Sequence, residues 1–250
     1  MIALITGASA GIGKACAYKF SENGYDLIVT GRRESKLKEL QSELEAKFKN
    51  KIKILAFDIQ EESQVKAAFT NLSAEWMNID VLVNNAGLAL GREGIDMGSM
   101  EDYNTMIDTN IKGLLYVSKA VIPNMKTRKA GHIINLSSTA AKEVYPGGGV
   151  YCATKHAVDA LTKGMRIDLL SYGIKVSSIS PGMVDTEFSK VRFKGNETLA
   201  AEVYKGFTPL YAEDVAEVIS YVASLPKHVN VNDLVLTCTA QANSFFTHKE

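Results

Sequence analysis

Residues 2–13 read Ile2-Ala-Leu-Ile-Thr-Gly-Ala-Ser-Ala-Gly-Ile-Gly13, an apolar run that leads directly into a turn with three glycines. Such a run is typical of a parallel strand that is buried on both faces. A helix-like stretch follows, and Asn23-Gly24 can end it. This context can hold a pyrophosphate, because glycine lets the backbone approach and the helix N-terminus offers free N–H groups. The spacing is GxxxGxG rather than GxGxxG, so a glycine turn without a ligand stays an alternative.

Beyond this unit, strand-like runs alternate with helix-like ones along all 250 residues. The runs with strand character are 26–30, 52–57, 79–83, 133–136, 174–179 and 233–237. Residues 100–125 predict one long helix or two in tandem, with Asn110 inside the pattern, and residues 150–171 predict another helix. The alternation predicts an α/β fold: a Rossmann-type doubly wound parallel sheet with helices on both faces, in a single domain over 1–250.

Composition excludes several classes of partner. Lys plus Arg and Asp plus Glu number 28 each, so no basic field would gather nucleic acid or an anionic membrane. The three cysteines are scattered, and no CxxC motif or histidine pair suggests a metal. No apolar run reaches the length of a membrane span, and no signal peptide is recognisable. We therefore expect a cytoplasmic protein that binds small molecules, without a metal.

Basic residues stand where a dinucleotide-binding fold selects its cofactor. The strand 26–30 ends in Gly31-Arg32-Arg33. An acid there would bind the ribose 2′-hydroxyl of NAD, whereas arginine accommodates the 2′-phosphate of NADP. Arg32 and Arg33 thus favour NADP, although they could merely flank the start of a helix.

Two further segments end strands at the edge where doubly wound sheets bind their ligands. Asp58, followed by Ile59, is either an adenine contact or only a turn acid. Asn85-Ala86-Gly87 follows the strand 79–83, and its small residues suit a chain that passes closely against a cofactor. An Asx turn would look similar.

A candidate reactive pair lies at the start of the helix 150–171. Of the ten tyrosines only Tyr151 has a lysine, Lys155, four residues on. On a helix these two share a face, and an ammonium beside a phenol favours the phenolate. Ser138 follows the strand 133–136, where its hydroxyl can point at a substrate oxygen. Together they predict a carbonyl/alcohol site, although a solvated Tyr and Lys would share the spacing.

Residues 186–209 are polar, irregular and mixed in charge. Such a segment is typical of a mobile lid over a pocket.

The motifs occur in the order that characterises one family. Residues 6–13, 84–87 and 181–186 together with Asn110, Ser138, Tyr151 and Lys155 resemble the short-chain dehydrogenase/reductase family over almost the whole chain. The resemblance implies a tetrad of Asn110, Ser138, Tyr151 and Lys155. Tyr151 would be the acid/base, Ser138 would orient the substrate oxygen, Lys155 would hold the nicotinamide ribose and lower the pKa of Tyr151, and Asn110 would support a water.

The same resemblance implies the residues that bind the cofactor. They are Gly7, Ala8, Ser9, Ala10, Gly11, Ile12, Gly13, Arg32, Arg33, Asp58, Ile59, Asn85, Ala86, Gly87, Tyr151, Lys155, Pro181, Gly182, Val184 and Thr186. Position 10 is Ala where some NADP-dependent members carry a basic residue. The preference for NADP would then rest on Arg32 and Arg33 alone.

A narrower resemblance concerns substrate. The segments 75–80, 87–91, 186–195 and 225–232 resemble NADP-dependent serine and 3-hydroxy-acid dehydrogenases, which oxidise serine, allo-threonine and 3-hydroxyisobutyrate. Arg192 would clamp the substrate carboxylate; a surface arginine or an intersubunit contact are its alternatives. The chain departs from this subgroup at Ala141-Lys-Glu143 and after Thr239, and both segments could line the site.

Two alternative functions remain. One is a reductase of another carbonyl substrate, such as a small ketone or a 3-oxoacyl thioester. The other is a protein that binds NADP without turnover, against which the complete tetrad argues. The resemblance also implies a homotetramer, with the helices 100–125 and 151–171 at its interface.

Overall fold

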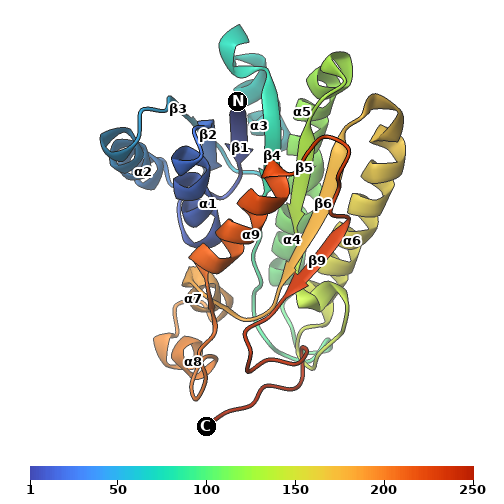
Figure 1. The fold of residues 1–250 in the computed structure, drawn as a ribbon. Coiled ribbons are helices and arrows are strands. Elements are labelled where there is room, and N and C mark those ends of the chain that lie inside the picture. The colour runs from blue at the N-terminus through green and yellow to red at the C-terminus, as the bar shows by residue number, and fades with distance from the viewer.

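Seven strands form one parallel sheet in the computed structural model, which describes residues 1–250 (Figure 1). The strands are β1 (Ile2–Ile5), β2 (Asp26–Gly31), β3 (Ile52–Ala56), β4 (Ile79–Asn84), β5 (His132–Leu136), β6 (Lys175–Pro181) and β9 (Asp233–Leu236). Their order is β3-β2-β1-β4-β5-β6-β9. The order reverses between β1 and β4, so the predicted doubly wound fold is confirmed, and this switch point is where such sheets bind ligands.

Helices cover both faces of the sheet. On one face lie α1 (Gly11–Glu22), α2 (Glu34–Lys47) and α9 (Ala212–Ser224), and on the other lie α3 (Glu62–Thr70), α5 (Leu114–Arg128) and α6 (Gly149–Leu169). Short 3₁₀ helices span Ala74–Trp76 (η1), Thr139–Ala141 (η3) and Leu170–Tyr172 (η4). None of the helices combines enough length with enough apolar residues to span a lipid bilayer.

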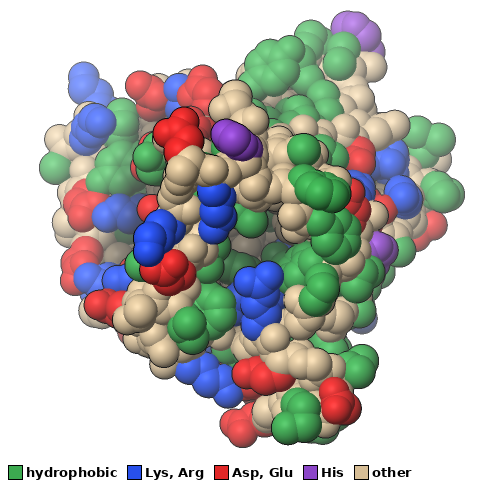
Figure 2. Space-filling view, turned by 90° about the horizontal axis from the view of Figure 1, so that it is seen from below, with side chains coloured by type: hydrophobic (Ala, Val, Ile, Leu, Met, Phe, Trp, Pro, Cys, Tyr) green, Lys and Arg blue, Asp and Glu red, His purple; other side chains and the backbone are tan.

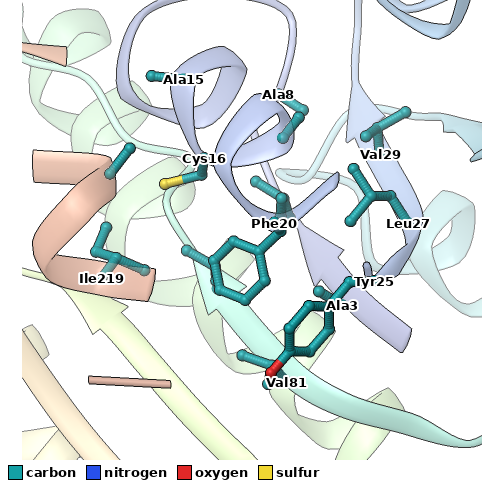
Figure 3. Close-up of a cluster of buried hydrophobic side chains, with 14 of the residues drawn as sticks. Ala3, Ala8, Ala15, Cys16, Phe20, Tyr25, Leu27, Val29, Val81 and Ile219 are labelled. Carbon is teal, nitrogen blue, oxygen red and sulfur yellow. The ribbon is translucent and has the colours of Figure 1, made fainter. Parts of the chain in front are cut away.

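Side-chain alternation along the strands separates two hydrophobic cores. Ala3 and Ile5 of β1 face the α1 side, while Leu4 faces the α5 side, and all three are fully buried. Figure 3 shows Phe20 of α1 at the centre of the first core, with Ile219 of α9 nearby. The rings of Phe20 and Tyr25 meet edge to face, with centroids 5.0 Å apart. Packing in these two cores holds the carboxyl ends of the strands in place.

The predicted tandem helix is interrupted where Asn110 stands. Helix α4 (Met100–Ile107) continues into a π-helical turn, η2 (Asp108–Gly113), and then into α5. A π turn inserts an extra residue and occurs often at functional sites. The helix is therefore distorted at the buried Asn110.

The segment 186–209 is more regular than its sequence suggested. It contains α7 (Glu187–Arg192) and α8 (Glu197–Glu202), flanked by the small ladder of β7 (Val184–Asp185) and β8 (Leu210–Tyr211). The side chains of Thr186 and Asn196 cap the two helices by accepting backbone N–H bonds. No periodic pattern indicated these two helices, because helices of six residues are too short to show one.

Candidate active site

A cavity of about 490 Å³ opens at the carboxyl ends of the parallel strands. Figure 2 views this end of the molecule and shows a hollow with basic side chains beside it. The predicted site residues that line the cavity are Gly7, Ser9, Ala10, Gly11, Ile12, Arg32, Arg33, Asp58, Ile59, Asn85, Ala86, Gly87, Ser138, Tyr151, Lys155, Pro181, Gly182, Val184, Thr186 and Arg192. Ala8, Gly13 and Asn110 are buried beside it and do not line it.

The glycine turn has a backbone that only glycine adopts without strain. Gly7 and Gly11 have φ values of +67° and +51°. At Gly13, where α1 packs against the turn, a Cβ would collide with the Gly7 carbonyl. The N-cap, Ala10, makes no side-chain bond, so the first N–H groups of α1 lack a side-chain cap at the cavity. This bare cradle at a helix N-terminus fits a pyrophosphate.

Neighbouring groups hold the cradle in place. Asn85 donates from Nδ2 to the Thr6 carbonyl oxygen at 2.8 Å, and the Thr6 hydroxyl accepts the N–H groups of Asn85 and Ala86. Ala8 donates its N–H to the Thr30 carbonyl oxygen and has no exposed surface. Ala8 and Gly13 therefore support the glycine loop and do not line the cavity. The family resemblance had implied that both residues contact the cofactor.

The two predicted arginines reach the same end of the cavity. Arg33 donates to Ser9 Oγ from Nε and Nη2, at 3.3 and 3.1 Å, and pairs with Glu187 of α7 at 3.1 Å. Arg32 lies 3.7 Å from Asp58. Asp58 also accepts the Gln60 N–H at 3.0 Å, so it lines the cavity and shapes a turn at once. The guanidinium groups of Arg32 and Arg33 each have N–H donors that remain available to bind an anion.

Asn110 in the π turn connects three segments. Its Oδ1 accepts the Leu88 N–H at 2.9 Å, and its Nδ2 donates to the Leu88 carbonyl at 2.8 Å and to Thr154 Oγ1 at 3.0 Å. Both amide hydrogens are thus used within the protein. The side chain therefore positions the Leu88 loop against α6, and support of a water by Asn110 stays a prediction.

Tyr151, Lys155 and Ser138 converge at the opposite end of the cavity from the arginine pair. Tyr151 and Lys155 lie on one face of α6, with Lys155 Nζ 5.9 Å from the Tyr151 ring centroid. The ammonium donates to the Leu136 carbonyl at 2.9 Å. Ser138 caps η3 by accepting the Ala140 N–H and lies within hydrogen-bonding reach of Tyr151.

Burial dominates the acid–base character of this pair. It raises the pKa of Tyr151, and the nearby Tyr145 adds to the rise, while the hydrogen bond from Ser138 and the charge of Arg192 oppose it. Burial also lowers the pKa of Lys155 to about 8. The direction for Tyr151 is opposite to that expected from the Tyr–Lys spacing, because removal of the phenolate from water outweighs the hydrogen bond from Ser138 and the charge of Arg192. The phenol of the chain alone is therefore a proton donor at neutral pH.

Arg192, at the end of α7, reaches into the cavity beside Tyr151. Its guanidinium carbon lies 5.8 Å from the Tyr151 ring centroid. It donates from Nε to the Gly91 carbonyl at 3.1 Å and from Nη1 to the Tyr145 hydroxyl at 2.9 Å. The alternative of a surface arginine was wrong, since Arg192 is partly buried and anchored in the site. Its remaining donors suit an oxyanion.

Sequence reasoning missed several residues of the cavity, among them Tyr145 and Phe188. Tyr145 anchors Arg192, and Phe188 packs on Tyr151 with ring centroids 5.7 Å apart. Gln241 and Ser244 bring the C-terminal tail into the lining, as its departure from the subgroup suggested. The segment Ala141–Glu143 does not line the cavity, but Glu143 accepts the Ser244 N–H at 2.8 Å. No motif marks these positions, because the fold alone brings them together.

Comparison with known proteins agrees with this geometry. The profile of the short chain dehydrogenase family matches residues 1–197. The chain is 45% identical to the NADP-dependent 3-hydroxy acid dehydrogenase YdfG of Escherichia coli (strain K12), over 97% of this chain and 96% of the relative. It is 44% identical to sulfoacetaldehyde reductase 2 of Chromohalobacter salexigens, over 98% and 97%. The closed form of a serine dehydrogenase complexed with NADP+ superposes with a TM-score of 0.94, at 43% identity and complete coverage of both chains.

Proposed function

The chain belongs to the short-chain dehydrogenase family, and on that premise we propose that it is an NADP-dependent oxidoreductase acting on the carbinol carbon of short 3-hydroxy acids. One observation carries the proposal: Ser138, Tyr151 and Arg192 meet in the cavity that also contains the glycine cradle and the arginine pair. A proton donor and an anion site at a nicotinamide pocket match a substrate with both an alcohol and a carboxylate.

The residues present fit NADP. The cradle of Gly7 to Ile12 would hold the pyrophosphate, and Arg32 and Arg33 would hold the 2′-phosphate. Asp58 and Ile59 would contact the adenine, and residues 85–87 and 181–186 would lie along the nicotinamide half. Lys155 would bond the nicotinamide ribose. When bound, NADP accepts or supplies the hydride at the carbinol carbon.

The chain's own groups handle the proton and the geometry. The Tyr151 hydroxyl exchanges a proton with the substrate oxygen, and Ser138 donates a hydrogen bond to the same oxygen. Arg192 clamps the carboxylate through its free guanidinium donors, which sets the distance from carboxylate to carbinol. Helices α7 and α8 form a lid, with Phe188 excluding water above Tyr151.

An alternative is a reductase of an aldehyde or ketone on the same machinery. It is favoured by the raised pKa of Tyr151, which provides a proton for a carbonyl oxygen, and by the likeness to sulfoacetaldehyde reductase 2. A sulfonate would occupy the same arginine site as a carboxylate. Two further expectations stay predictions. One is a homotetramer with residues 100–125 and 151–171 at its interface, and the other is a cytoplasmic location.

The substrate clamp can be tested by removing Arg192. We expect the wild type to oxidise serine, allo-threonine and 3-hydroxyisobutyrate with NADP, and simple secondary alcohols much more slowly. Arg192→Ala should lower kcat/KM for the acids about 10- to 100-fold, the effect of losing a charge-assisted hydrogen bond, and should spare their methyl esters. The absorbance of the reduced cofactor gives the rates with the acids and with their methyl esters. Equal losses on acids and esters would assign Arg192 a general role in the lid.

The arginine pair makes a prediction about cofactor choice. Replacing Arg32 and Arg33 together by Gln should raise KM for NADP about 100-fold and change KM for NAD only a few-fold, since only NADP carries the 2′-phosphate. Steady-state kinetics with each cofactor provides the test. Lys36→Gln is the matched control, because Lys36 is exposed, pairs with Glu39 and does not line the cavity. An unchanged NADP/NAD ratio in the double variant would contradict the assignment.

A further inference from the structure

The chain leaves the sheet at Ser138 through a tight turn. Ser137 is still held at the sheet, because its N–H donates to the Ile179 carbonyl at 2.7 Å. Beyond it η3 closes on Ser138. The Ala141 N–H donates to the Ser138 carbonyl at 2.9 Å, and the Ser138 Oγ accepts the Ala140 N–H at 3.1 Å. The direction of the Ser138 hydroxyl therefore depends on where the far end of this turn is held.

Lys142, the residue after η3, connects the turn to two other elements. Its Nζ lies 3.0 Å from Asp159 Oδ1 of α6 and 2.7 Å from Oδ2 of Asp233, the first residue of β9. The side chains of Lys142 and Asp159 are only 28% and 13% exposed, so solvent screens this pair less than it screens a surface pair. Asp159 lies about two turns after Tyr151 on the same helix. The bridge thus joins the Ser138 turn to the helix that carries Tyr151.

Lys142 has no substitute within the turn. Ala140 and Ala141 are buried, but they offer only methyl groups to their neighbours. The two contacts of Lys142 are the only ion pairs that residues 138–143 make. The segment 141–143 is also where the sequence departs from the dehydrogenases of the subgroup it resembles, so the bridge lies outside the family motifs.

We propose that Lys142 is a positioning residue, whose two ion pairs hold the Ser138 hydroxyl where it and the Tyr151 hydroxyl reach the same substrate oxygen. The inference rests on the proposed function and adds to it a residue that does not line the cavity. Small displacements of a hydrogen-bond donor are costly at the reacting atoms and matter little elsewhere. Lys142 therefore acts on kcat rather than on cofactor binding.

The test is a double-mutant cycle of Lys142→Met and Ser138→Ala. Methionine keeps the unbranched stem and removes the charge. Lys142→Met should lower kcat with a 3-hydroxy acid about fivefold and change KM for NADP less than about twofold. In the Ser138→Ala background the same substitution should lower kcat less than about twofold, because the hydroxyl that Lys142 positions is already absent. Lys142→Arg can form both ion pairs and should restore most of the wild-type kcat.

Lys163→Met is the matched control. Lys163 pairs with the same Asp159 at 2.7 Å, from α6 itself, and has no contact with the turn. It should leave kcat unchanged. Asp233→Asn breaks only the β9 half of the bridge and should give a smaller loss, again only while Ser138 is present. It repeats the test should Lys142→Met not fold.

Two results would overturn the positioning role and leave the proposed function intact. One is a kcat unchanged by both Lys142→Met and Asp233→Asn, and the other is an equal fold-loss with and without the Ser138 hydroxyl. Absence of NADP reduction by the wild type with every 3-hydroxy acid, or an unchanged kcat in Ser138→Ala, would instead contradict the proposed function, and the positioning role with it.

Discussion

Tyr151→Phe is expected to lower kcat by about two or more orders of magnitude, the effect of losing a general acid/base. The phenyl ring would keep the packing of Tyr151 against Phe188 and its place near Lys155 and Arg192, so the fold and the cavity should persist. The substitution removes only the hydroxyl to which we assign the exchange of the substrate proton. Single-turnover and steady-state assays with NADP and a 3-hydroxy acid measure the loss.

Tyr145→Phe is the matched control for this prediction. It removes a hydroxyl from another tyrosine of the cavity, the one that accepts a hydrogen bond from Arg192. We expect it to raise KM through a looser Arg192 and to change kcat only a few-fold. Near-normal turnover of Tyr151→Phe, or an equal loss of kcat in both variants, would contradict the acid/base role of Tyr151.

The strand ends and glycine positions could be predicted from local sequence because their chemistry is local. The turn from Gly7 to Gly13 needs glycine for its backbone angles, and the spacing of Tyr151 and Lys155 follows from the pitch of a helix. Alternating strands and helices predict a parallel sheet with right-handed crossovers and helices on both faces. Twenty predicted residues therefore line one cavity.

The rest depends on tertiary packing, which no short pattern records. Gln241 and Ser244 reach the cavity because the tail folds back across the carboxyl edge of the sheet. Tyr145 enters the site through its bond with Arg192, from a different loop. The pKa of Tyr151 was predicted in the wrong direction because the depth of burial, not the neighbouring lysine, decides it. Electrostatic roles are thus less predictable from sequence than positions.

Lys155→Met is expected to stabilise the free protein while abolishing its activity. Burial lowers the pKa of Lys155 from 10.5 to about 8, so holding its ammonium in the fold costs about 3 kcal/mol at pH 7. The lost hydrogen bond to the Leu136 carbonyl offsets about 1 kcal/mol of the gain. Urea unfolding without cofactor should therefore show the variant about 2 kcal/mol more stable at pH 7.

The pH dependence separates this cause from better packing by methionine. Between pH 8 and pH 10.5 the folded wild type has released the Lys155 proton while the unfolded chain still holds it, so wild-type stability rises with pH. The advantage of the variant should shrink through this window to nearly zero at pH 10. Lys163→Met, on the exposed side of α6, lacks the buried charge and should show no such advantage at pH 7. A stability gain of Lys155→Met that stays constant from pH 7 to pH 10, or a loss at pH 7, would show that Lys155 is not a strained charge held for function.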